Sequence, residues 1–133
     1  SKKTKQWPID HWQKIVQFFN ILGLRVLLPW GNLEEYQASK ILRKTSTNCL
    51  VLPKMKISDL ANIISSAKCV IGVDSGLTHL ANALGIPTIG LYMDSNPYLT
   101  GVYPNIKVPS VNLGEIGTIP TVESTISQIE AII

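Results

Sequence analysis

The fold of this chain is decided by the stretch Cys69-Val70-Ile71-Gly72-Val73-Asp74-Ser75-Gly76-Leu77-Thr78-His79-Leu80. Its first five residues form an apolar run that indicates a buried parallel strand. The chain then turns through Asp-Ser-Gly into a short helix that ends at Gly85 and Pro87. Such a turn leaves backbone N–H groups free at the positive end of the helix dipole. The stretch therefore predicts a phosphorylated ligand, and a nucleotide sugar is the first choice.

Helices and strands alternate along the rest of the chain with short connections, which predicts a parallel sheet covered by helices. We expect strands at Arg25–Leu28, Cys49–Leu52, Thr88–Leu91 and Ile106–Val111. The last of these should lie at an edge of the sheet, because Pro109 interrupts it. We expect helices from Pro8 to Gly23, from Leu33 to Lys44, from a cap at Ser58 to Ser66, and from a cap at Thr121 onward. The predicted architecture is one Rossmann-like α/β domain, in which ligands bind at the carboxyl ends of the strands. Three polar loops follow those ends: Pro29–Glu35, Pro53–Ile57 and Asp74–His79.

Length and composition exclude several classes of protein. With 133 residues, 45% of them hydrophobic, the chain is long enough for one well-packed domain and is not disordered. No apolar run approaches the roughly 18–20 residues of a membrane span, and no signal peptide is visible. A net charge of +3 suits phosphate ligands or an anionic membrane surface and gives no argument for nucleic acid. Because the sequence opens at Ser1 without Met, we expect a fragment of a longer protein.

The two cysteines, Cys49 and Cys69, lie in or beside apolar strands and lack the spacing of metal ligands. We interpret them as reduced core residues of a cytosolic protein, and we expect no metal site.

Around the Asp-Ser-Gly turn, Ser75, Gly76 and Leu77 should offer backbone N–H groups to a phosphate, and Gly76 allows close approach because it has no Cβ. Asp74 would accept hydrogen bonds from sugar hydroxyls or cap the helix. His79 lies one turn into the helix, where a single histidine is more often a packed residue than a catalyst.

A second candidate region is the sharp turn Pro29-Trp30-Gly31-Asn32, which is followed by Glu34 and Glu35. A carboxylate there can accept both hydroxyls of a ribose, although two glutamates at a helix start also favour the helix dipole without any ligand. Lys5 could approach a phosphate. The motifs GxGxxG and GxxxxGK[ST] are missing, which argues against NAD dehydrogenases and P-loop kinases.

Four blocks of sequence together resemble the carboxyl-terminal domain of the lipopolysaccharide heptosyltransferases of glycosyltransferase family nine, which have the GT-B fold. They are Lys5-Gln6-Trp7-Pro8 with His11-Trp12, Leu28-Pro29-Trp30-Gly31, Val51-Leu52-Pro53-Lys54-Met55 and Val73-Asp74-Ser75-Gly76-Leu77-Thr78-His79-Leu80. The resemblance covers nearly the whole chain, in order. The second and third blocks point to the first heptosyltransferase rather than the second.

The resemblance implies two Rossmann-like domains that face each other across a cleft, with residues 1–133 as the donor-binding domain and the amino-terminal acceptor domain absent. The donor would be ADP-heptose and the acceptor a Kdo residue of lipid A at the cytoplasmic face of the inner membrane. By this similarity Lys5 meets the phosphates and stabilises the leaving group, Glu34 meets the ribose, and the backbone around Met55 holds the adenine. Asp74 through Leu77, with His79, would hold the diphosphate and heptose.

Two positions depart from the family pattern. Ser1 stands where the family often has Thr, and it would join the donor contacts. The loop after Gly31 is one residue shorter, so that Glu34 and Glu35 could exchange roles.

The family reaction inverts the anomeric centre without metal or cofactor, and its carboxylate base lies in the amino-terminal domain. This chain alone should therefore bind the donor weakly and turn nothing over. Three alternatives remain open. One is another GT-B nucleotide-sugar enzyme, either a different family-nine transferase or a sugar-nucleotide epimerase that prefers UDP. The second is a non-catalytic nucleotide-binding module. The third is an α/β domain whose Asp-Ser-Gly turn is only a capped helix start.

Overall fold

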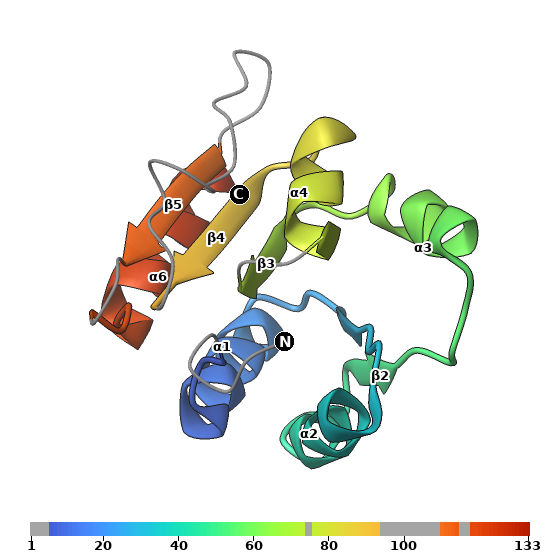
Figure 1. Cartoon of the computed structure of the whole chain (residues 1–133). Coiled ribbons are helices and arrows are strands. Elements are labelled where there is room, and N and C mark those ends of the chain that lie inside the picture. The colour runs from blue at the N-terminus through green and yellow to red at the C-terminus, as the bar shows by residue number, and fades with distance from the viewer. Residues whose placement is uncertain (1–5, 74–75, 94–109, 115–117) are drawn as a thin grey trace. The chain divides into compact units, whose positions relative to one another are not determined.

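The computed structural model describes residues 6–73, 76–93, 110–114 and 118–133 (Figure 1). The chain divides into two compact units, Pro8–Met55 and a second that joins Ser1–Trp7 to Lys56–Ile133. Within the described residues each unit has its own parallel sheet, one of two strands and one of three. The predicted α/β class with parallel strands and flanking helices is confirmed, and the strands are distributed over two sheets where the sequence predicts one.

The unit Pro8–Met55, called here the β1–β2 unit, alternates helices and strands. Its elements are α1 (Ile9–Ile21), β1 (Val26–Leu28), α2 (Leu33–Arg43) and β2 (Cys49–Val51). β1 and β2 pair in parallel, with Leu27 opposite Leu50. The core combines residues of both helices and both strands, since Val16, Leu42 and Cys49 are buried and are packed by Trp12, Val26 and Leu28.

The first helix shows how local sequence sets the ends of an element. α1 begins directly after Pro8, whose ring fixes a φ that a helix start tolerates. It closes at Gly23, whose φ of +76° is the left-handed conformation that glycine adopts without strain. Both ends agree with the prediction. Leu22, the residue that caps the helix at its carboxyl end, is 46% exposed.

The second unit, called here the β3–β5 unit, contains α3 (Ile57–Ile64), β3 (Val70–Val73), α4 (Gly76–Ala83), β4 (Thr88–Tyr92), β5 (Ser110–Gly114) and α6 (Val122–Ile132). The strand order is β3-β4-β5 and all pairs are parallel. α4 contacts β3 and β4, and α6 contacts β4 and lies behind β4 and β5 in the view of Figure 1. The central strand β4 is buried along its whole length, which explains its uninterrupted apolar sequence.

Trp7 is joined to the β3–β5 unit, although it lies far from it in sequence. Its side chain is buried, and its indole N–H donates a hydrogen bond of 2.9 Å to the carbonyl of Pro120. Thr121, the next residue, caps α6 as predicted, because its hydroxyl accepts a hydrogen bond from the amide of Ser124.

Two predictions about element ends in this unit are wrong. Ser58 does not cap α3: the capping position is Lys56, no side chain bonds the helix start, and Ser58 lies inside the first turn. Serine is favoured at the capping position by only about 1 kcal/mol, so its presence alone does not fix which residue is the cap. In the described residues β5 runs from Ser110 to Gly114, past the predicted end at Val111, whereas the predicted start at Ile106 lies outside them; its edge position is confirmed within the described sheet. Residues 94–109, with Pro109, lie outside the described residues.

No helix in the described part of the chain combines the length and the apolar character that crossing a bilayer requires.

Candidate nucleotide-binding loops

The turn between β1 and α2 is fixed by hydrogen bonds from its own side chains. Asn32 is the capping residue of α2, and its Oδ1 accepts a hydrogen bond of 2.8 Å from the amide of Glu35. In return, Oε1 of Glu35 accepts a hydrogen bond of 2.7 Å from the amide of Gly31. The two bonds run in opposite directions across the helix start, as in a capping box, and they hold the turn in one conformation.

The adjacent residues Glu34 and Glu35 therefore differ in their hydrogen bonding and exposure. Glu35 is half-buried and occupied by the turn, whereas Glu34 is exposed in the first turn of α2. A ligand at this turn can reach the Glu34 carboxylate without breaking the bond between Gly31 and Glu35. The sequence leaves open which glutamate would meet a ribose, and this geometry favours Glu34.

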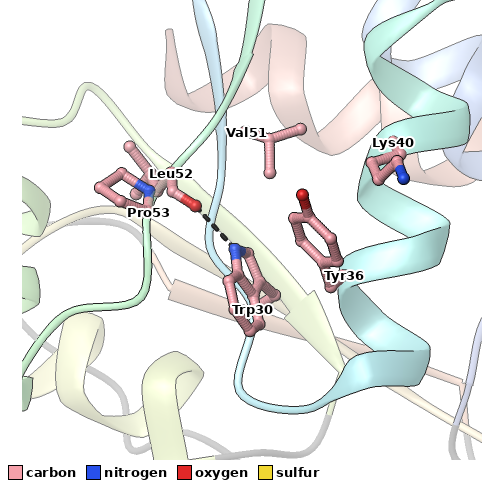
Figure 2. Close-up of a pocket in the computed structure, with 6 residues that line it drawn as sticks. All are labelled: Trp30, Tyr36, Lys40, Val51, Leu52 and Pro53. Atoms are coloured by element: carbon pink, nitrogen blue, oxygen red, sulfur yellow. Dashed lines mark hydrogen bonds between the residues drawn. The ribbon is translucent and has the colours of Figure 1, made fainter.

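Trp30 connects the same turn to the end of the neighbouring strand. Its indole N–H donates a hydrogen bond of 2.6 Å to the carbonyl of Leu52, as Figure 2 shows. Leu52 directly follows β2, and its own amide bonds the carbonyl of Leu28 at the end of β1. Because β1 and β2 are parallel, the loops that follow them leave the sheet at its carboxyl edge, where the sequence predicts a ligand.

Beside this link lies a pocket of about 420 Å³, lined by Trp30, Tyr36, Lys40, Val51, Leu52 and Pro53 (Figure 2). The rings of Trp30 and Tyr36 have centroids 4.6 Å apart, and Nζ of Lys40 lies 5.3 Å from the centroid of the Tyr36 ring. Aromatic faces beside a cation make a wall that suits planar or anionic groups. Sequence reasoning missed Tyr36 and Lys40, whose spacing of four residues along one helix face is the available signal.

Met55, the predicted adenine contact, is half-buried at the end of the β1–β2 unit and is not among the residues that line this pocket.

The strand–turn–helix arrangement of the β3–β5 unit is confirmed on both sides of the Asp-Ser-Gly turn, since β3 ends at Val73 and α4 begins at Gly76. Gly76 is exposed, and the space where a Cβ would stand is open. Leu77 and His79 are half-buried in the first turn of α4. The other predicted site residues, Ser1, Lys5, Asp74 and Ser75, lie outside the described residues.

Thr78, which sequence reasoning did not single out, fastens the start of α4 to the end of β3. It is 1% exposed, and its hydroxyl donates a hydrogen bond of 2.7 Å to the carbonyl of Val73. A Cβ on Gly72 would overlap with the Thr78 hydroxyl oxygen, so the glycine makes room for this bond. The residue immediately before the Asp-Ser-Gly turn is thereby held by the helix that follows it.

Both cysteines are free, with Cys49 buried and Cys69 half-buried. Burial raises the pKa of the Cys49 thiol, against a smaller opposing effect of Arg43, and burial raises the pKa of the Cys69 thiol to about 11. Both thiols are therefore protonated near neutral pH. Within the described ranges, no three His, Cys, Asp or Glu side chains are placed to hold a metal ion.

Comparison with known proteins assigns the chain to a family. The family model described as glycosyltransferase family 9 (heptosyltransferase) matches residues 1–127. The chain belongs to glycosyltransferase family 9. This family 9 chain is 37% identical over 103 residues to lipopolysaccharide heptosyltransferase 1 of Escherichia coli strain K12, in an alignment that covers 77% of the chain and 32% of that protein. The chain thus spans about a third of the length of the curated relatives it matches.

Two solved structures resemble the family 9 chain closely. The E. coli heptosyltransferase WaaC with ADP has a TM-score of 0.88 and 31% sequence identity, over 100% of this chain and 42% of that one. WaaC with ADP-2-deoxy-2-fluoro heptose has a TM-score of 0.85 and 29% identity, over 98% of this chain and 40% of that one.

Proposed function

We propose that this family 9 chain is the donor-binding, carboxyl-terminal domain of a heptosyltransferase, which transfers heptose from ADP-heptose to a Kdo residue of lipid A during synthesis of the lipopolysaccharide inner core. The observation that carries the proposal is the likeness of the whole chain to a heptosyltransferase that binds ADP. The exposed carboxylate of Glu34 and the strand–turn–helix of β3 and α4 supply the two kinds of contact that a nucleoside diphosphate needs.

The β1–β2 unit would provide the contacts to the nucleoside. Glu34 would accept hydrogen bonds from the ribose hydroxyls, because it is exposed while Glu35 is bound to Gly31. The backbone around Met55 would hold the adenine. Both groups follow the carboxyl ends of paired parallel strands, Glu34 in the first turn of α2 and Met55 in the loop after β2.

The β3–β5 unit would provide the contacts to the diphosphate and the heptose. The backbone N–H groups of Ser75, Gly76 and Leu77 would bind phosphate oxygens at the start of α4, with Asp74 and His79 on the sugar side. Lys5 would neutralise phosphate charge, and Ser1 would be a further contact to the donor.

The proposed chemistry is an inverting, metal-independent transfer. A carboxylate base of the amino-terminal domain would remove the proton from the acceptor hydroxyl, and the oxygen would attack the anomeric carbon as the bond to the diphosphate breaks. Lys5 and the amides at the start of α4 would stabilise the negative charge that develops on the departing ADP. The partners would be the amino-terminal domain and the cytoplasmic surface of the inner membrane, which holds the acceptor.

An NMR titration of the isotope-labelled chain with ADP, and separately with UDP, tests the donor assignment. We expect ADP to shift the signals of Glu34, Met55 and Gly76–Leu77 selectively. Equal shifts with UDP would contradict the adenine assignment, and a preference for UDP would favour the epimerase alternative. Heptose transfer to a Kdo acceptor by residues 1–133 alone would contradict the placement of the base in the other domain.

A further inference from the structure

We propose that Trp30 is a positioning residue of the donor site: its indole holds the turn before α2, which presents Glu34, and the loop that carries Met55 in one fixed register. This inference rests on the proposed function, and it assigns to Trp30 an effect on nucleoside binding exerted through other residues.

The first argument is the hydrogen-bond register of the β1–β2 sheet. The amide of Val26 bonds the carbonyl of Asn48, and parallel pairing advances by two residues on each strand. Continued past Leu28, this register would bring the backbone amide of Trp30 opposite the carbonyl of Leu52. The structure places the indole N–H of Trp30 at that carbonyl instead, 2.6 Å away. The side chain thus keeps the register while the backbone leaves the sheet to form the turn.

The second argument is that both ends of this link are fastened. Leu52 is 6% exposed, and its amide also bonds the carbonyl of Leu28. The Trp30 ring packs against Tyr36 of α2, at 4.6 Å between centroids and an interplanar angle of 48°. Figure 2 shows the indole between the turn before α2 and the chain at Leu52 and Pro53. One side chain therefore contacts both Leu52, just after β2, and Tyr36 in the first turn of α2, the turn that also contains Glu34.

The third argument concerns what a nucleoside requires. Its ribose and its base are joined by a single bond, so the protein groups that contact them must stand at a matching separation. Glu34 is four residues after Trp30, and Met55 is three residues after Leu52. If the link were missing, the two loops would have to be ordered by the ligand, and that cost would appear as weaker binding.

The test removes the hydrogen-bond donor of the link in the full-length enzyme, by two substitutions that differ in how much of the indole they keep. Trp30→Phe keeps an aromatic ring and removes the N–H, and benzothienyl-alanine incorporated at position 30 keeps the bicyclic shape as well. We expect the Kd for ADP and the KM for ADP-heptose to rise about fivefold, with kcat changed less than twofold, in both variants. Inhibition by inorganic pyrophosphate, which has no nucleoside, should stay unchanged. An equal loss for pyrophosphate, or unchanged ADP affinity in both variants, would overturn the positioning role.

A double-mutant cycle distinguishes positioning from simple loss of structure. In a Glu34→Ala background, Trp30→Phe should weaken ADP binding by less than half as much as it does in the wild type, because the carboxylate that Trp30 positions is already absent. Trp7→Phe is the matched control, since it also removes an indole-to-carbonyl bond, that to Pro120; its effect should add to that of Glu34→Ala. If the effects of Trp30→Phe and Glu34→Ala on ADP binding were additive, the positioning role of Trp30 would be overturned. The proposed function would still stand in that case, provided that the wild-type enzyme binds ADP. Failure of the wild-type enzyme to bind ADP would overturn both.

Discussion

The amide of Gly31 donates a hydrogen bond of 2.7 Å to Oε1 of Glu35, so the second of two adjacent glutamates closes the turn before α2 and the first stays open to solvent. This relationship separates a carboxylate that holds the turn from the carboxylate that we propose binds the ribose, and it makes the two residues distinguishable by experiment.

Glu35→Ala should lower the free energy of unfolding by roughly 1 kcal/mol, because it removes the carboxylate that accepts the hydrogen bond from the Gly31 amide. Glu34→Ala should weaken ADP binding about tenfold by the loss of the proposed charge-assisted contact to the ribose, with a much smaller effect on stability. Urea unfolding and isothermal titration calorimetry measure the two quantities. Asn32→Ala, which removes the other half of the cap, is the control and should match Glu35→Ala in stability. The opposite pattern would assign the ribose to Glu35.

Gly72→Ala should destabilise the protein by roughly 1–3 kcal/mol, because the added Cβ overlaps with the buried hydroxyl of Thr78. Adding Thr78→Ala relieves the overlap, so the double variant should be more stable than the sum of the two single effects indicates. Gly76→Ala is the matched control. The added Cβ would stand in open space, so the stability of this variant should not fall. Additive effects at positions 72 and 78 would show that the sheet moves aside instead.

Lys5→Ala should weaken the binding of ADP and leave the binding of adenosine unchanged, because its proposed contact is to phosphate alone. A comparison of the two ligands by calorimetry in the same variant isolates this contact. An equal loss for both ligands would mean that the substitution disturbs the fold near Trp7.

The Cys69 thiol gives a pH-dependent signature. Its pKa is raised by burial from 9.0 to about 11, so between these values the unfolded chain releases the thiol proton first. The stability due to this thiol is complete below about pH 9 and is lost as the pH rises toward 11. The difference in unfolding free energy between wild type and Cys69→Ala should therefore shrink over this interval. A constant difference would show that the thiol titrates normally, as would rapid alkylation of Cys69 by iodoacetamide at pH 8.

Features that depend on a few adjacent residues were predictable from the sequence. The start of α1 at Pro8, its end at Gly23 and the Thr121 cap follow from local backbone and capping preferences, and the apolar run of β4 indicates a buried strand. The predicted cap of α3 is wrong because the preference of serine for the capping position amounts to only about 1 kcal/mol, and the helix begins two residues earlier, after Lys56.

The contacts that organise the candidate site could not be predicted, because they join residues whose separation follows no helical or strand period. The bond from Trp30 to Leu52 spans 22 positions and depends on the strand register. The hydroxyl of Thr78 bonds Val73 only because Gly72 leaves room for it. The roles of Lys5, Asp74 and Ser75 stay predictions, since these residues lie outside the described part of the chain.

The unequal size of the two sheets has a consequence for amide hydrogen exchange. A two-stranded pair is intrinsically weak, whereas β4 is bonded on both sides and fully buried, so its amides should exchange among the slowest in the chain. The proposed nucleoside loops follow the shorter sheet, β1 and β2. Bound ADP would therefore slow amide exchange mainly in β1 and β2, where opening is easiest. Donor binding would in this way stabilise the sheet whose loops are proposed to contact the nucleoside.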